Sequence, residues 1–393
     1  MALVPVQDAR LNHLARVVDA IARSSHDAPD ALWAAVTAAS AQLTAQLPAA
    51  VQAELAKPSV WARDLETEPL LQDSVDRFTL HPIAHHDIHE LYQRLRDKFW
   101  FVSEVDLSQD RSDMDKLTPA ERQWLLNTLA FFASSDGVVV ENLVSRVMNE
   151  IKMPEARHFF GMQVGNETVH SEMYSELITN LVTDAAERLR LFSAMSRSPA
   201  IAAKAEWALQ FTRNKDSVSL GELLIVYACL EGIMFSASFA CIFKFRERNL
   251  FPGLSQANLM ISGDEYKHMQ NGLRLYDKYV VNRLPVARIH TLVREAVALE
   301  EMFVLESLPE PVMGMSADLM CTYVQFIGNF LVRHIDGVPD VFARVPTNPL
   351  PYMEQQGQQV MTGFFERRVA EYQKQGRQAS AGEALVDFSI TDF

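Results

Sequence analysis

Two Glu-x-x-His motifs stand out among the residues that could do chemistry. The first joins Glu167 to His170, and the second joins Glu265 to His268. On a helix of 3.6 residues per turn, residues three apart share a face, so each motif presents a carboxylate beside an imidazole. One such motif arises by chance on surface helices, whereas two copies in apolar helical patterns indicate a binding site.

Each motif is preceded by a lone acidic residue within an apolar helical run. Asp136 lies 31 residues before Glu167, and Glu231 lies 34 residues before Glu265. Four carboxylates and two imidazoles suit iron or manganese, whereas zinc favours thiolates or a strictly tetrahedral set. Their four charges would offset two divalent cations, and this is the ligand plan of di-iron carboxylate bundles. The spacing therefore predicts a di-metal site with pseudo-twofold symmetry.

Long helices must position these residues. One helix has a clear start signal, with Thr118 as N-cap, Pro119 as the first helical residue and Glu121 closing a capping box. Further helices are expected over residues 155–180, 184–196, 200–212, 218–248, 258–281, 286–307 and 316–334. Alternating strand patterns are scarce, so the predicted fold is all-α, a ferritin-like helical bundle with a buried di-metal carboxylate site.

The chain divides by composition into three parts. Residues 1–75 are rich in alanine and form a predicted helical extension of unknown role. Residues 76–345 form the predicted di-metal domain. Residues 346–393 form a C-terminal segment in which the polar stretch 373–384 indicates a disordered linker.

Composition and charge indicate which binding partners and which cellular compartment to expect. The formal net charge of −14, without a dense Lys/Arg stripe, argues against nucleic-acid binding. The apolar segment 223–243 is long enough to cross a membrane, but Glu231 lies at its middle, so a buried helix is expected instead. There is no signal-peptide pattern, and the isolated cysteines fit a reducing cytosol: Cys229, Cys241 and Cys321. We therefore expect a cytoplasmic protein without membrane or nucleic-acid partners.

Long motifs in the chain resemble those of the class I ribonucleotide reductase small subunit, the eukaryotic-type group in particular. They include "FWFVSEVDLSQD", "LAFFASSDGVVVENL", "ARHFFGMQVGNETVHSEMYS", "EGIMFSASFACIF" and "FFERRVAEYQ", and the similarity runs from about Arg77 to Phe393. The resemblance implies an oxidoreductase subunit that supplies a radical for the reduction of ribonucleotides to deoxyribonucleotides, the precursors of DNA.

The resemblance implies a role for each residue that matches a family motif. Tyr174 matches the tyrosine that the metal centre and O2 convert into a stable radical. The implied ligands are Asp136, Glu167 and His170 for one metal, and Glu231, Glu265 and His268 for the other. The implied radical pocket consists of Phe235, Phe239 and Ile261. Di-iron is expected first, with di-manganese and mixed Mn/Fe left open.

The resemblance also implies a route for the radical to the large subunit, where the nucleotide is reduced. The residues that match this relay are Trp100, Asp264 and His170, followed in the C-terminal segment by Tyr372 and Glu366. The final "VDFSITDF" is expected to anchor on the large subunit through Phe388 and Phe393. A homodimer is expected as well.

Two features depart from the family pattern, and two other functions compete. An arginine commonly precedes the Asp-Glu pair, but Gly263 stands there in this chain, which removes a charge beside Asp264. Residues 1–75 lack the pattern of the nucleotide-binding domain that some relatives carry. The competing functions are a metal–tyrosine oxidase of the same fold and a ferritin-like metal store, neither of which needs the relay residues or the tail.

Overall fold

The computed structural model describes residues 59–353, and α-helices make up most of this part of the chain. Among the described residues no strand forms, apart from an isolated bridge between Val312 and Met315. The α-helices are α4 (Val60–Thr67), α5 (His86–Arg96), α6 (Asp110–Asp113), α7 (Pro119–Asn142), α8 (Met148–Glu150), α9 (Pro154–Leu181), α10 (Ala185–Phe192), α11 (Pro199–Arg213), α12 (Leu220–Gly232), α13 (Ser236–Glu247), α14 (Pro252–Tyr279), α15 (Val286–Ser307) and α16 (Ala317–Val332). The prediction of an all-α fold is confirmed.

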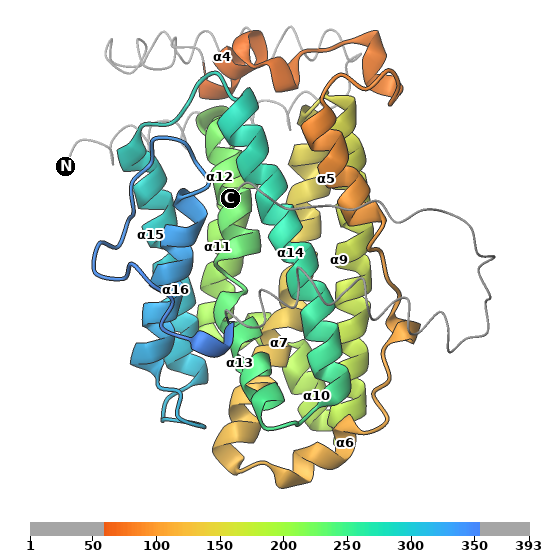
Figure 1. The fold of residues 1–393 in the computed structure, drawn as a ribbon, viewed down its shortest axis with the longest axis vertical. Helices are drawn as coiled ribbons and strands as arrows, with labels where there is room; N and C mark the ends of the chain where they lie inside the picture. The colour runs from red at the N-terminus through yellow and green to blue at the C-terminus, as the bar shows by residue number, and fades with distance from the viewer. Residues whose placement is uncertain (1–58, 354–393) are drawn as a thin grey trace, which may run out of the picture. The chain divides into compact units, whose positions relative to one another are not determined.

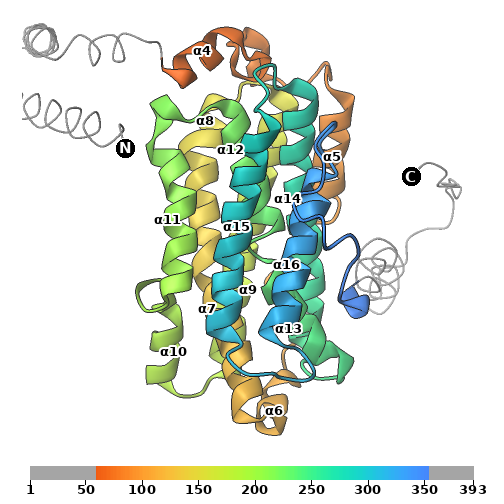
Figure 2. The same cartoon turned by 90° about the vertical axis from the view of Figure 1, so that its left-hand side faces the viewer.

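Four long elements form the centre of the bundle in residues 64–353. They are α7, α9, α14 and the consecutive pair α12 and α13, and they run side by side in Figure 1. Helix α5 packs on α9 and α14, while α11, α15 and α16 pack on α12 (Figure 2). The central helices are therefore covered on several sides, which accounts for their apolar sequences.

The helix ends show why the long helices begin where they do. Thr118 caps α7 as predicted, because its hydroxyl accepts from the Glu121 amide at 3.3 Å and the Glu121 carboxylate accepts from the Thr118 amide at 2.8 Å. Helix α14 begins at Pro252, where the Asp110 carboxylate accepts from the amides of Gly253 and Leu254 at 2.9 and 2.6 Å. In both places these hydrogen bonds satisfy backbone amides that have no partner within their own helix.

The predicted single helix over 218–248 is wrong in one respect, because it is interrupted. Helix α12 ends at Gly232 and α13 begins at Ser236, and residues 233–235 between them are not helical. The amides of Ile233 and Met234 both bond to the carbonyl of Cys229, at 2.9 and 3.2 Å. The sequence pattern stays apolar through the interruption, so hydrophobic periodicity does not reveal it.

The stretch from Leu220 to Glu247 is long and apolar enough to cross a membrane, yet 94% of its most apolar window is buried in the bundle. The prediction of a buried helical element around Glu231 is therefore confirmed. Cys229 and Cys241 are also buried there as free thiols, whereas Cys321 on α16 is half-buried.

Residues 64–71 belong to the predicted N-terminal extension but bind the bundle. Asp64 accepts from the amide of Leu220 at the start of α12, at 2.7 Å. Glu68 accepts from the amides of Val281 and Asn282, which follow α14, at 2.9 and 2.7 Å. The division of the chain at residue 75 stays a prediction.

Candidate di-metal centre and radical site

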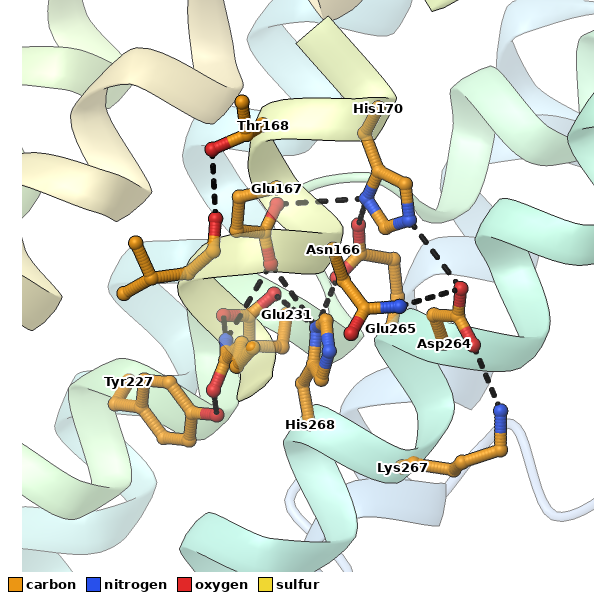
Figure 3. Close-up of polar contacts among 12 residues, drawn as sticks. Asn166, Glu167, Thr168, His170, Tyr227, Glu231, Asp264, Glu265, Lys267 and His268 are labelled. Atoms are coloured by element: carbon orange, nitrogen blue, oxygen red, sulfur yellow. Dashed lines mark hydrogen bonds and ion pairs between the residues drawn. The ribbon is translucent and has the colours of Figure 1, made fainter. Parts of the chain in front are cut away.

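Helices α9 and α14 bring the two Glu-x-x-His motifs together, and α12 adds Glu231 (Figure 3). Ligand atoms of Glu167, Glu231, Glu265 and His268 all lie within 4.8 Å of one another. His170 joins them, since its Nδ1 lies 3.1 Å from Glu265 Oε1. All five side chains are buried. The structure thus assembles five of the six predicted ligands.

Each imidazole contacts carboxylates from both motifs. His268 Nδ1 lies 2.9 Å from Glu265 Oε2 and 3.0 Å from Glu167 Oε1. His170 Nδ1 lies 3.5 Å from Glu167 Oε2, in addition to its contact with Glu265. Glu167 and Glu265 therefore stand between the two imidazoles, where two metal ions could share them.

The carboxylates dominate the electrostatics of both histidines. Burial disfavours the imidazolium, but the neighbouring carboxylates, Asp264 foremost, outweigh it and raise the pKa of His170 well above its ordinary value. Burial likewise lowers the pKa of His268. The neighbouring carboxylates, Glu167 foremost, outweigh it and raise that pKa well above its ordinary value. A buried group of acids such as this one needs compensating cations, which can be protons or metal ions.

Several polar atoms in the cluster have no hydrogen-bond partner among the described residues. They are Glu167 Oε2, Glu231 Oε2, His170 Nδ1 and His268 Nε2. Burial, followed by repulsion from Glu265 and Glu167, raises the pKa of Glu231 well above its ordinary value. Buried polar atoms without partners are costly, and metal coordination would satisfy carboxylate oxygens of this kind. The oxygen and nitrogen donors present fit a pair of iron or manganese ions.

Asp136, the sixth predicted ligand, lies on α7, which packs against α9. Its side chain lies outside the described part of the structure. Its role as a ligand therefore stays a prediction.

Tyr174 lies in an aromatic environment and is only 1% exposed. Its ring stacks on Phe132 of α7, with ring centroids 4.3 Å apart and planes 4° from parallel. Phe132 in turn contacts Phe235 and Phe239, with centroid distances of 5.9 and 5.2 Å. The sequence analysis missed Phe132, although it lies one helical turn before Asp136. Ile261 is buried on α14, and its place in the pocket stays a prediction.

Trp100, Asp264 and His170 form one connected set. The Trp100 indole Nε1 donates to Asp264 Oδ2 at 2.9 Å, and His170 Nε2 lies 3.4 Å from the same oxygen. The His170 and Trp100 rings also stack, with centroids 6.0 Å apart. His170 therefore contacts the carboxylate cluster through Nδ1 and Asp264 through Nε2, and Asp264 continues to Trp100. All three residues are buried.

Two further donors hold Asp264, and both escaped the sequence analysis (Figure 3). Asn166 Nδ2 donates to Asp264 Oδ2 at 3.1 Å, and Lys267 Nζ donates to Asp264 Oδ1 at 2.8 Å. Burial alone would raise the pKa of Asp264, but Lys267 and then His170 outweigh it and hold that pKa well below its usual range. A cation thus lies beside Asp264 although residue 263 is glycine, because Lys267 supplies it from the next helical turn.

A second polar link, also missed, approaches the cluster from α12. The Tyr227 hydroxyl donates to Gln163 Oε1 at 2.5 Å, and Gln163 Nε2 donates to Glu231 Oε1 at 2.7 Å. Tyr227 precedes Glu231 by one helical turn, and Gln163 precedes Glu167 by one turn. Each therefore shares a helix face with a ligand and orients the carboxylate of Glu231.

The predicted tail residues lie outside the described part of the chain. These are Glu366, Tyr372, Phe388 and Phe393. Their roles stay predictions.

Comparison with known proteins identifies a family for nearly the whole of the described chain. The family model "Ribonucleotide reductase, small chain" matches residues 77–349. Ribonucleoside-diphosphate reductase subunit M2 of Homo sapiens is 40% identical over 327 residues, which cover 83% of each chain. The ribonucleoside-diphosphate reductase small chain of Trypanosoma brucei brucei is 39% identical over 332 residues, covering 83% of this chain and 95% of that one.

Solved structures agree with the sequence comparison. The ribonucleotide reductase Rnr4 homodimer from Saccharomyces cerevisiae matches with a TM-score of 0.68 at 27% identity, covering 79% of this chain and 94% of that one. A dimanganese(II) NrdF from Streptococcus sanguinis matches with a TM-score of 0.61 at 18% identity, over 72% of this chain and 99% of that one, which shows the shared fold.

These similarities do not favour the alternative of an oxidase or metal store that acts without a large subunit. The chain belongs to the ribonucleotide reductase small-chain family, in the class I, eukaryotic-type group, and functions as the small subunit of that oxidoreductase.

Proposed function

We propose that this small subunit forms a radical on Tyr174 and passes it to a large subunit through His170, Asp264 and Trp100. The connection between these last three residues carries the proposal, because Asp264 Oδ2 contacts both the His170 imidazole and the Trp100 indole. A continuous hydrogen-bonded path from the metal cluster to a buried indole serves no evident purpose in a metal store. It is the arrangement that long-range transfer of an electron and a proton requires.

The surroundings of Tyr174 support its role as the radical site. A phenoxyl radical lasts only where water and reductants are excluded, and Tyr174 is buried against the ring of Phe132. Phe235 and Phe239 contact Phe132 and extend the apolar surroundings of Tyr174. Two metal ions held by the carboxylate cluster would, with O2, supply the oxidising power that removes an electron and a proton from Tyr174.

We propose iron as the first metal, bound by His170, Glu167, Glu231, Glu265 and His268 together with Asp136. Oxygen and nitrogen donors without thiolates support iron or manganese, and iron is the expectation where the tyrosine is present. A di-manganese or mixed Mn/Fe pair is the alternative that the reconstitution experiment below separates.

The proposed partners follow from the family. A small chain implies a large subunit that binds the nucleotide, and we propose that the C-terminal segment docks on it through Phe388 and Phe393. Within that segment, Tyr372 and Glu366 would carry the radical across the interface. We propose a homodimer, as the yeast Rnr4 structure is, and a cytoplasmic location.

Electron paramagnetic resonance tests the proposal directly. Protein reconstituted with Fe(II) and O2 should give a phenoxyl signal that disappears in Tyr174→Phe. Tyr323→Phe is the matched control, since Tyr323 is also a buried tyrosine but lies on α16. A signal that persists in Tyr174→Phe would contradict the assignment of the radical. A signal obtained with manganese but not with iron would contradict the choice of metal.

A further inference from the structure

The interruption between α12 and α13 frees backbone groups in the interior of the bundle. The carbonyl of Met234 lies within the interruption, and the amide of Ala237 lies in the first turn of α13. Both residues are buried, at 2% and 5% exposure. Backbone groups in such a place must find partners outside their own helix.

One ion pair satisfies both of these groups. Lys204 of α11 donates from Nζ to the carbonyl of Met234 at 3.0 Å. Glu300 of α15 accepts from the amide of Ala237 through Oε1, also at 3.0 Å. Lys204 Nζ and Glu300 Oε2 pair directly with each other. The pair therefore bridges the two sides of the interruption from two neighbouring helices.

The pair is fully buried in apolar surroundings. Lys204 is 3% exposed and Glu300 is 0% exposed. The ammonium lies 3.7 Å from the ring centroid of Phe131 and 4.3 Å from that of Phe303. Removing two charges from water is costly, and apolar residues of similar size often serve stability as well or better. What apolar residues could not do is bind the carbonyl of Met234 and the amide of Ala237.

The interruption separates the two functional parts of the central element. Glu231 lies just before it, in the carboxylate cluster, and Phe235 lies at its end. Phe235 contacts Phe131, with ring centroids 5.6 Å apart. Phe131, whose ring faces the Lys204 ammonium, therefore also contacts an aromatic residue near Tyr174. Phe132, the next residue along α7, is the one stacked on Tyr174.

We propose that Lys204 and Glu300 are positioning residues that hold the interruption in one conformation. They thereby set the place of Phe235 in the wall around Tyr174 relative to Glu231 in the metal cluster. The first half of this inference concerns the metal-free polypeptide alone. The second half, the effect on the radical, rests on the proposed function.

Amide hydrogen exchange on the metal-free, full-length protein tests the first half. Two double variants form a matched pair: Lys204→Met/Glu300→Leu removes both charges and the acceptor for Ala237, whereas Lys204→Met/Glu300→Gln removes both charges but keeps an acceptor. Peptides covering residues 233–240 should exchange about tenfold faster in the Leu variant than in the Gln variant. Equal exchange in the two variants would overturn the inference.

A control pair separates local positioning from general stability. Arg122 and Glu187 join α7 to α10 through two hydrogen bonds, of 2.8 and 2.5 Å, and touch neither side of the interruption. Arg122→Met/Glu187→Leu should leave exchange over residues 233–240 at the wild-type rate. Faster exchange there in the control as well would mean that the effect is global, and this would overturn the inference.

The lifetime of the radical tests the second half. After reconstitution with Fe(II) and O2, both Lys204 double variants should lose the phenoxyl signal severalfold faster than wild type, and the Leu variant should be the faster of the two. If wild type itself gives no signal, the proposed function fails while the exchange result stands. If exchange changes but the lifetime does not, the coupling to Tyr174 is overturned. If the Leu variant does not fold, a wild-type lifetime in the Gln variant overturns it equally.

Discussion

The two Glu-x-x-His motifs have the same spacing but different surroundings. His170 uses both ring nitrogens, because Nδ1 faces the carboxylates and Nε2 faces Asp264. His268 places Nδ1 against the carboxylates in the same way, but its Nε2 has no hydrogen-bond partner among the described residues. The rings of Phe159 and His268 lie nearly perpendicular to each other, with centroids 6.3 Å apart. One motif is connected to a polar path, and the other packs against an aromatic ring.

The pseudo-symmetry of the candidate ligands therefore does not extend to the neighbouring residues. The proposed metal site needs both histidines, which accounts for their shared spacing. The proposed radical path needs one connection, and among residues 59–353 the α9 motif has it, whereas the α14 motif does not.

Breaking the connected side should abolish turnover while sparing radical formation. In Asp264→Ala the path from His170 to Trp100 loses its shared carboxylate, so nucleotide reduction with the large subunit should fall by about a thousandfold or more. The phenoxyl signal should still form. The matched variant beside His268, Phe159→Leu, should keep most of its turnover. Comparable losses of turnover in both variants would contradict the asymmetry.

Removing the end of the chain should separate transfer from radical formation in the same way. Deletion of residues 387–393 should abolish ribonucleotide reduction and binding to the large subunit, because Phe388 and Phe393 are the proposed anchors. The phenoxyl signal, measured by paramagnetic resonance, should stay at the wild-type level. A truncated protein that lacks the radical would argue that the tail has another role.

Lys267 should matter only on the connected side. In Lys267→Met, Asp264 loses a charged hydrogen-bond donor, and such bonds contribute about 1.5–3 kcal/mol, so turnover should fall by roughly ten- to a hundredfold. Radical yield should be unchanged, and Lys267→Arg should recover part of the loss. Equal turnover in Lys267→Met and wild type would show that Asn166 and Trp100 hold Asp264 without it.

Metal binding should strengthen as the pH rises. The pKa values of His170 and His268 are raised by the carboxylates, and both imidazoles must lose a proton before they can bind metal. In the metal-free protein their contribution to stability is fully present below about pH 6.5, and it is lost as the pH rises through the raised values. Fe(II) added under anaerobic conditions near pH 7 should therefore release protons from both imidazoles, and from Glu231 where its raised pKa keeps it protonated, read with an indicator dye in weak buffer. Release of no protons would contradict the proposed charge balance.

The smallest effect should come from the link behind Glu231. Tyr227→Phe removes the hydrogen bond to Gln163, so the free energy of unfolding should fall by about 1 kcal/mol. Denaturant titration of the metal-free protein measures it. Because this link lies away from Asp264, turnover per radical should not change.

The fold, and the residues that cluster as candidate ligands, could be predicted from the sequence because they depend on periodic patterns. The apolar runs, the capping box at Thr118 and the two motifs are all local signals. The supporting residues are local as well, and a single pattern connects them. The residue four positions before each predicted ligand is Phe132, Gln163, Asn166, Tyr227, Ile261 or Asp264. Residues four apart share a helix face, so this position selects neighbours of the site.

Other features depend on contacts between distant segments and have no local signal. Lys204 and Glu300 are 96 residues apart, and nothing in either helix marks them as partners. The interruption between α12 and α13 falls on three apolar residues, 233–235, and Lys204 and Glu300 bind the backbone groups that it frees. Lys267 has no local signal either, because a lysine three residues after an aspartate is common on surface helices.

The environment of Asp264 has a consequence for the speed of charge transfer. Trp100, Asn166 and His170 approach one carboxylate oxygen while Lys267 holds the other, so the group has little freedom to rotate. Electron transfer is slowed when nuclei must rearrange to follow the charge, and a preorganised group needs little rearrangement. On the proposed path, a carboxylate fixed at both oxygens would therefore give a low reorganisation energy, which would allow the radical to cross it in either direction.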